Sequence, residues 1–119
     1  MTMRKIGAGP RLSKGVIANG TLYLSGLVPR PATRGKSVKE QTADVLHQID
    51  ELLAEAGTDR SMLSAMIWLQ DIRTVDDFNA IWEGWIASDS APTRACVEAR
   101  LQSPAIMVEV AATALVEQA

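Results

Sequence analysis

The sequence predicts a single α+β domain in which a mixed sheet carries two helices on one face. Three observations support this class: two apolar patterns with helical spacing, an Asn-Gly pair between strand-like residues, and two long apolar runs of strand length. The predicted order is strands, helix, strand, helix, strands. The domain takes up residues 1–119, because chains divide into several domains only at greater length.

Two helices are expected. The first begins after a capping box of Ser37 and Glu40 and ends at Gly57, which supplies a left-handed stop. Its stripe at helical spacing comprises Val38, Val45, Leu46, Ile49, Leu52, Leu53 and Ala56. The second begins near Thr74, whose hydroxyl is expected to cap the first turn, and ends before Ser88. One face of this helix carries Phe78, Ile81, Trp82, Trp85 and Ile86.

Two short stretches of the chain are predicted to be strands joined in a hairpin. Asn19-Gly20 tolerates the positive φ of a type I′ turn, so the flanking residues 16–18 and 21–24 should pair with each other. A further short strand is expected over residues 93–97, directly after Pro92.

Two longer strands are expected to be apolar on both faces. Residues 62–69 are almost continuously apolar, and residues 106–114 carry only one charge, at Glu109. Two helices can cover only one face of the sheet, so the opposite face should meet another copy of the chain. The sequence therefore predicts a homo-oligomer.

Composition and charge exclude several classes of protein. Hydrophobic residues make up 47% and charged residues 22% of the chain, a balance typical of a domain that folds in water. The formal net charge of −2 gives little attraction to nucleic acid or anionic lipid, so neither is expected as a partner. A single cysteine and an N-terminus without a secretory pattern favour the cytoplasm.

Glu109 and Arg94 are the strongest candidates for chemistry. Glu109 lies among apolar strand residues, where it either faces solvent or is a desolvated carboxylate that needs a donor. Arg94 shares a strand face with Cys96 and could bind a small carboxylate through two parallel hydrogen bonds. An ordinary surface ion pair remains the alternative for Arg94.

Other polar side chains are weaker candidates. Cys96 has no histidine in a protease-like pattern, which favours an inert thiol lining a pocket. His47 lies among acidic residues on the polar side of the first helix, where solvated surface is favoured and no metal is predicted. Asn79 borders the apolar face of the second helix. Ser25-Gly26 ends the hairpin, where glycine permits close approach of a ligand or another chain.

Several segments together resemble the RidA/YjgF family of reactive-intermediate deaminases over almost the whole chain. Each is weak alone, but their order and spacing are specific. They are residues 19–26 with Pro29, 40–42, 53–57, Asp71 with Phe78-Asn79, and 91–97 followed by Pro104 and 108–110.

The resemblance implies a chorismate-mutase-like fold, assembled as a homotrimer with clefts at the subunit interfaces. It also implies hydrolysis of 2-imino acids, such as 2-iminobutanoate and 2-iminopropanoate, to 2-oxo acids and ammonia without metal or organic cofactor. Arg94 would bind the substrate carboxylate, and Glu109 would position or activate the attacking water. The matching pocket residues are Leu12, Ser25, Gly26, Asn79, Ala95 and Cys96.

The chain departs from the family pattern before the hairpin and in the last strand. The deaminases carry Gly-Pro-Tyr-Ser-Gln-Ala where residues 11–15 stand here, so Leu12 replaces the aromatic that closes the pocket. A second glutamate of the last strand is replaced by Ala111. Non-catalytic binding or sensing of a small 2-oxo acid is therefore the alternative to imine hydrolysis, and a small anionic metabolite is the expected partner in both. An RNA-cleaving or protein-interaction role ranks last.

Overall fold

Residues 3–86 and 89–116 of the computed structural model form one six-stranded mixed sheet and two α-helices, which confirms the α+β class. The helices are α1 (Val38–Ala56) and α2 (Val75–Trp85), with short 3-10 turns η1 (Pro31–Thr33) and η2 (Ile72–Thr74). No helix in these ranges is both long and apolar enough to cross a membrane. The strands are β1 (Met3–Ile6), β2 (Gly15–Ala18), β3 (Thr21–Leu24), β4 (Met62–Leu69), β5 (Thr93–Glu98) and β6 (Val108–Leu115).

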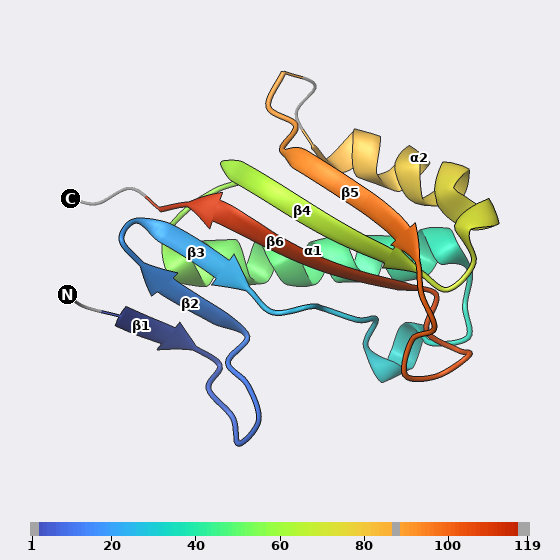
Figure 1. Cartoon of the computed structure of the whole chain (residues 1–119), viewed down its shortest axis with the longest axis horizontal. Helices are drawn as coiled ribbons and strands as arrows, with labels where there is room; N and C mark the ends of the chain where they lie inside the picture. Colours follow the sequence, from blue (N-terminus) through green and yellow to red (C-terminus); the bar gives the residue numbers. More distant parts are fainter. Residues whose placement is uncertain (1–2, 87–88, 117–119) are drawn as a thin grey trace.

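The strands lie in the order β1-β2-β3-β6-β4-β5, so β1 and β5 are the two edges of the sheet. Every neighbouring pair is antiparallel except β4 and β5, which are parallel. Figure 1 shows α1 crossing behind the sheet and α2 lying alongside β5. Both helices contribute side chains to the same core as β4 and β6, as predicted for two helices on one face.

The hairpin and the first helix form where local chemistry places them. Asn19 and Gly20 have φ values of 51° and 76°, as a type I′ turn requires. Ser37 Oγ accepts a hydrogen bond from the backbone N–H of Glu40 at 3.1 Å, which caps the start of α1. Gly57 ends the helix with a left-handed φ of 81°.

The start of the second helix differs from the prediction. The Thr74 hydroxyl does not cap α2; instead it donates to the carbonyl of Asp71 at 2.6 Å. The reason is that η2 runs directly into α2, so the capping position moves back to the beginning of that turn. There the Asp71 carboxylate accepts from the backbone N–H of Arg73 at 3.0 Å. Helix α2 ends at Trp85, and Ser88, named in the predicted end, lies outside the described residues.

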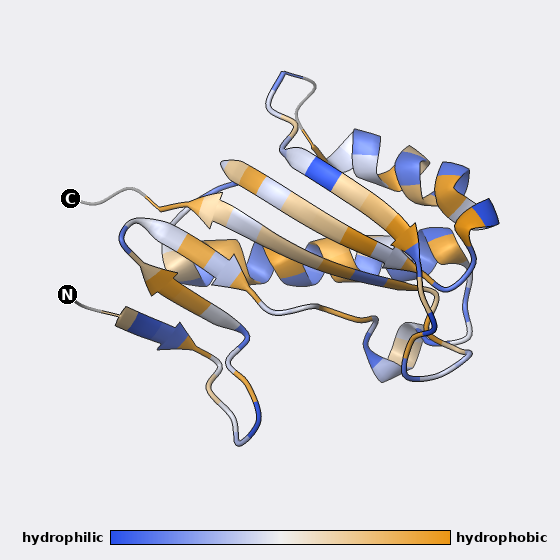
Figure 2. Cartoon of the chain, in the orientation of Figure 1, coloured by the Kyte–Doolittle hydropathy of each residue, from blue (hydrophilic) through white to orange (hydrophobic). Residues whose placement is uncertain are grey.

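The two faces of the sheet have different environments within one chain. The helix face is fully covered, and Ile67 of β4 and Val110 of β6, which pair with each other, have no exposed surface. The opposite face, here called the open face, carries half-buried residues such as Met66 and Trp68. Figure 2 shows that β4 and β6 are apolar along much of their length. Burial on both faces was the prediction, and a single chain provides it for one face only.

Gln41 fastens the segment that leads into β6. This amide is completely buried on α1, and its Nε2 donates to the carbonyls of Lys36 at 3.0 Å and Ala105 at 2.9 Å. Its Oε1 accepts from the backbone N–H of Met107 at 2.8 Å. Gln70 donates from β4's end to the same segment, at the carbonyls of residues 103 and 106. The start of β6, and with it the position of Glu109, is therefore fixed from two sides.

Replacing this buried amide is expected to lower stability strongly. Gln41→Leu keeps the volume but leaves the Lys36 carbonyl and the Met107 N–H without this partner, each at a cost of about 1–3 kcal/mol. The Ala105 carbonyl still accepts from the Gly35 N–H. We expect urea unfolding to give a free energy lower by roughly 3 kcal/mol. Thr42→Val is the control, because this neighbour is equally buried and its hydroxyl bonds only the Val38 carbonyl of its own helix. An equal loss of unfolding free energy in both variants would contradict this role of the Gln41 hydrogen bonds.

Candidate active site

Arg94 is presented by the edge strand β5 toward helix α2. It pairs with Ala65, a residue of the helix face, so its side chain leaves on that face. Its Nη2 donates to Oδ1 of Asn79 at 2.7 Å. A guanidinium has donors only, so the amide oxygen of Asn79 must be the atom turned toward it. The guanidinium carbon also lies 5.6 Å from the ring centroids of both Phe78 and Trp82.

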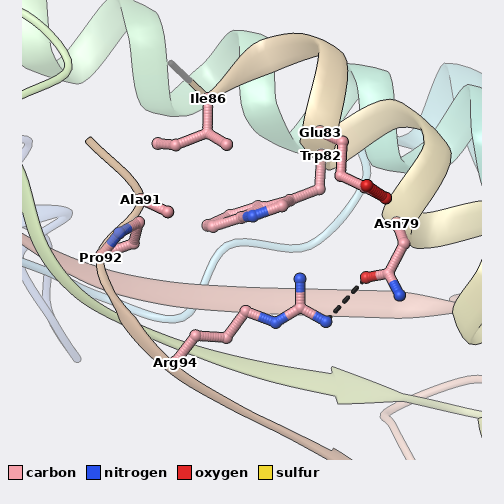
Figure 3. A pocket seen from close by; sticks show the side chains of 7 residues that line it. All are labelled: Asn79, Trp82, Glu83, Ile86, Ala91, Pro92 and Arg94. Atoms are coloured by element: carbon pink, nitrogen blue, oxygen red, sulfur yellow. Dashed lines mark hydrogen bonds between the residues drawn. The ribbon is translucent and has the colours of Figure 1, made fainter. Parts of the chain in front are cut away.

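A pocket of about 460 Å³ opens beside this guanidinium, between α2 and β5. Figure 3 shows Arg94 and Asn79 joined along one side of the pocket, with Trp82 above them. Within the described part of the chain, Asn79 is the only hydrogen-bond partner of the Arg94 side chain. Its remaining N–H groups can therefore bind an anion, and a planar fork suits a carboxylate. We call Arg94, Asn79 and this pocket the arginine half-site.

Glu109 lies directly against Gly26. The backbone of Leu27 exchanges two hydrogen bonds with Val110, at 2.8 and 3.0 Å, which holds the segment after β3 against β6. A Cβ on residue 26 would overlap Oε2 of Glu109, so a larger residue there would push this carboxylate out of its position. The close approach predicted at Ser25-Gly26 is thus made by a carboxylate of the same chain. We call Ser25, Gly26 and Glu109 the glutamate half-site.

The Glu109 carboxylate is half-buried and forms no hydrogen bond or ion pair with residues 3–86 or 89–116. Burial raises the pKa of this carboxyl above its usual value. A desolvated carboxylate without a donor is a stronger proton acceptor than one exposed to water, so Glu109 is suited to act as a general base.

The two half-sites lie on opposite faces of the sheet in one chain. Glu109 pairs with Trp68 and lies on the open face, whereas Arg94 pairs with Ala65 and lies on the helix face. A single chain therefore does not bring the guanidinium and the carboxylate together. Neighbouring residues divide in the same way, because Ala95 pairs with Met66 on the open face while the side chain of Cys96 packs against the core.

The remaining predicted pocket residues behave differently from one another. Burial raises the pKa of the Cys96 thiol, with a smaller opposing effect of the Arg94 charge, which agrees with an inert thiol. Leu12 is 55% exposed in the loop between β1 and β2. This loop lies toward the β1 edge of the sheet, far from β5 in Figure 1. Leu12 therefore does not belong to the arginine half-site of its own chain, whereas the carbonyl of Lys14 in the same loop accepts a hydrogen bond from the Ser25 N–H of the glutamate half-site at 2.9 Å.

Sequence reasoning missed two parts of the site. The helical spacing places the aromatic rings of Phe78 and Trp82 in the core, and in the structure both rings also lie beside the Arg94 guanidinium. Their spacing on the second helix, with Asn79 between them, was the available signal. The pocket walls at Ile86 and Pro92 could not be paired from sequence, because they meet only after α2 packs beside β5. No three His, Cys, Asp or Glu side chains converge as a metal site in the described ranges.

The pKa shift of Glu109 predicts how stability varies with pH. Its folded-state pKa is raised, so the folded chain gains stability from this group at low pH and loses it as pH rises through that pKa. Glu109→Gln cannot ionise, so it should be more stable than the unmodified chain at about pH 7, with a smaller advantage near pH 4. Urea unfolding of both proteins at each pH, at one fixed protein concentration, measures this difference in stability.

Asp44 supplies a control of opposite sign. Burial alone would raise the pKa of this carboxyl, but hydrogen bonds from Thr33 and Arg30 hold it below its usual value. Asp44 therefore stabilises the fold above its unfolded-state pKa, and this contribution is lost as pH falls through the folded-state pKa. Asp44→Asn should accordingly be less stable near pH 7, with a smaller deficit at low pH. A stability deficit of Glu109→Gln at neutral pH would contradict the assignment of a desolvated carboxylate.

Comparison with known proteins agrees with this fold. The family model described as Endoribonuclease L-PSP matches residues 2–116. A RutC family protein of Haemophilus influenzae is 40% identical over 111 residues, covering 92% of this chain and 95% of that protein. The RutC family protein YoaB of Escherichia coli is 38% identical over 117 residues, covering 98% and 100%. The crystal structure of a YjgF family member from Neisseria meningitidis has 46% identity and a TM-score of 0.93, covering 100% and 98%. The predicted membership is thereby confirmed: the chain belongs to the RutC/YjgF family, whose model bears the name Endoribonuclease L-PSP.

Proposed function

We propose that this protein hydrolyses reactive 2-imino acids to 2-oxo acids and ammonia, in clefts completed between copies of the chain. One observation carries the proposal: the Arg94 guanidinium is fixed by Asn79, keeps free N–H groups, and opens on a pocket of the size used for small molecules. Such a guanidinium selects a carboxylate, and the polar partner needed for hydrolysis is the unpaired carboxylate of Glu109.

The reaction needs little more than orientation and one proton acceptor. The substrate carboxylate would bind Arg94, which holds the electrophilic C2 of the imine in a defined position. Glu109 accepts a proton from water as the water oxygen forms a bond to C2, and the C=N electron pair moves to nitrogen. Glu109 returns this proton to the nitrogen, and the hydroxyl on C2 gives up a second proton to the same nitrogen. The C–N bond then breaks, so that ammonia leaves and the C2 oxygen becomes the ketone of the 2-oxo acid.

Assembly follows from the placement of the half-sites. The two half-sites lie on opposite faces of the sheet, so a two-fold contact that uses the same patch of both chains cannot contain both. An arginine half-site can meet a glutamate half-site only in a head-to-tail contact, in which one face of a chain meets the opposite face of the next. Head-to-tail contacts that close form rings, and the family resemblance favours a ring of three. The apolar open face, with Trp68 half-buried and Val97 42% exposed, supplies surface for such a contact.

An assay of ammonia release tests the proposal. An amino-acid oxidase generates the 2-imino acid, and its decay is followed with and without the purified protein. The protein should speed the release of ammonia beyond spontaneous hydrolysis, in proportion to its concentration. Equal rates with and without the protein would exclude imine hydrolysis.

The second candidate function is binding of a 2-oxo acid without turnover. The observation that favours it is Leu12, which offers no phenol that could hydrogen-bond a substrate. Saturable binding of a 2-oxo acid in calorimetry, combined with no faster imine decay, would support this function. RNA cleavage, which the name of the family model mentions, ranks lower because a net charge of −2 gives little attraction to phosphate. Incubation with single-stranded RNA tests it directly.

A further inference from the structure

The pocket beside Arg94 has walls that differ in chemistry from its guanidinium end. Figure 3 shows Ile86, Ala91 and Pro92 around the space on one side of the guanidinium, with the Trp82 ring above it and Asn79 on the other side. Trp82 and Ile86 are buried in the helix-face core, so this part of the wall is fixed by packing. A group that enters the pocket from the guanidinium would therefore contact mostly carbon.

This arrangement bears on the side chain of a bound acid. Once Arg94 holds the carboxylate, the substituent on C2 points either into the pocket or into solvent. An apolar substituent gains by entering, since each methylene removed from water tightens binding by about fourfold. The volume of about 460 Å³ lies within the range of small-molecule sites and leaves ample room beyond a one- or two-carbon group.

A charged substituent meets a different environment. Glu83 lines the pocket one helical turn after Asn79, and it forms no ion pair with the described residues. A second carboxylate on the ligand would approach this side chain while leaving water for apolar walls, and both effects oppose binding. The pocket thus discriminates against dicarboxylic acids.

We infer that this pocket is the side-chain subsite, and that the preferred substrates are 2-imino acids with bulky apolar side chains, branched aliphatic or aromatic. The inference rests on the proposed function for the imine chemistry and on the pocket for the side chain. Its test therefore uses binding, which can be measured whether or not turnover occurs.

Calorimetry with a series of 2-oxo acids tests the subsite. Pyruvate, 2-oxobutanoate, 4-methyl-2-oxopentanoate, phenylpyruvate and 2-oxoglutarate share the carboxylate and differ in the side chain. We expect 4-methyl-2-oxopentanoate to bind about fiftyfold more tightly than pyruvate, and 2-oxoglutarate to bind no more tightly than pyruvate. Equal affinity across the series, preference for pyruvate, or no binding would overturn the inference.

Two matched variants connect the preference to the pocket. Ala91→Phe narrows the pocket and should reduce the affinity ratio of 4-methyl-2-oxopentanoate to pyruvate to about fivefold. Ala54→Phe adds the same ring to the exposed surface of α1, away from the pocket, and should leave the ratio unchanged. Equal ratios in the two variants would overturn the assignment. Affinity that rises with the size of the apolar side chain, without imine hydrolysis, would refute only the proposed reaction. Imine hydrolysis with equal affinity across the series would refute only the subsite.

Discussion

Arg94→Ala is expected to lower kcat/KM for imine hydrolysis by about 10² to 10⁴. The guanidinium would hold the substrate carboxylate through two hydrogen bonds, and each hydrogen bond to a charged group contributes about 1.5–3 kcal/mol. The side chain is exposed on an edge strand, so the fold should survive the change. Initial rates of ammonia release, together with thermal unfolding of the same samples, separate lost binding from lost structure.

Three variants make this prediction specific. Arg94→Lys keeps the charge but not the planar fork, so it should recover only a small part of the activity. Asn79→Asp places a carboxylate against the guanidinium, which would neutralise the charge that the substrate needs and weaken 2-oxo acid binding sharply. Arg73→Ala removes an exposed guanidinium from η2 and should change the rate by less than about twofold. Full activity in Arg94→Ala would refute the role of this residue.

Elements set by local chemistry could be predicted from the sequence. The first helix was predicted between Ser37 and Gly57 because both caps act within a few residues of the chain. The alternation within β6 places Val108, Val110 and Ala112 on one face and Glu109 on the other, and the structure shows the first of these faces buried. In both cases the information lies within one segment.

Elements that depend on distant pairing could not be predicted in the same way. Strand β1 carries Arg4 and Lys5 at the sheet edge, where no apolar alternation marks a strand. The prediction that Thr74 caps α2 was wrong because the short turn η2 runs directly into this helix, and its residues lie outside the apolar pattern that marks the helix. The placement of Arg94 and Glu109 on opposite faces follows from the pairing of β5 and β6 with β4. Alternation within a strand tells which residues share a face, not which face of the next strand aligns with it.

Mixing two inactive chains is expected to restore activity. Arg94→Ala keeps a working glutamate half-site, and Glu109→Gln keeps a working arginine half-site. If each cleft takes one half-site from each of two neighbouring chains, a mixed ring contains a cleft in which both native residues meet. If both residues of a cleft came from one chain, no mixture could restore it. Co-expression with two different affinity tags, followed by purification on both, yields only mixed oligomers.

The amount of recovery also reports how the ring is built. In a head-to-tail trimer that contains both variants, one cleft has both native residues, a second has one substituted residue and the third has two. About one third of the unmodified activity should therefore return. Mixed oligomers of Arg94→Ala with the unmodified chain provide the control, because their activity follows only the number of native arginines. Verified mixed oligomers without recovery would refute the shared cleft, since each would then carry both half-sites and still lack a working centre.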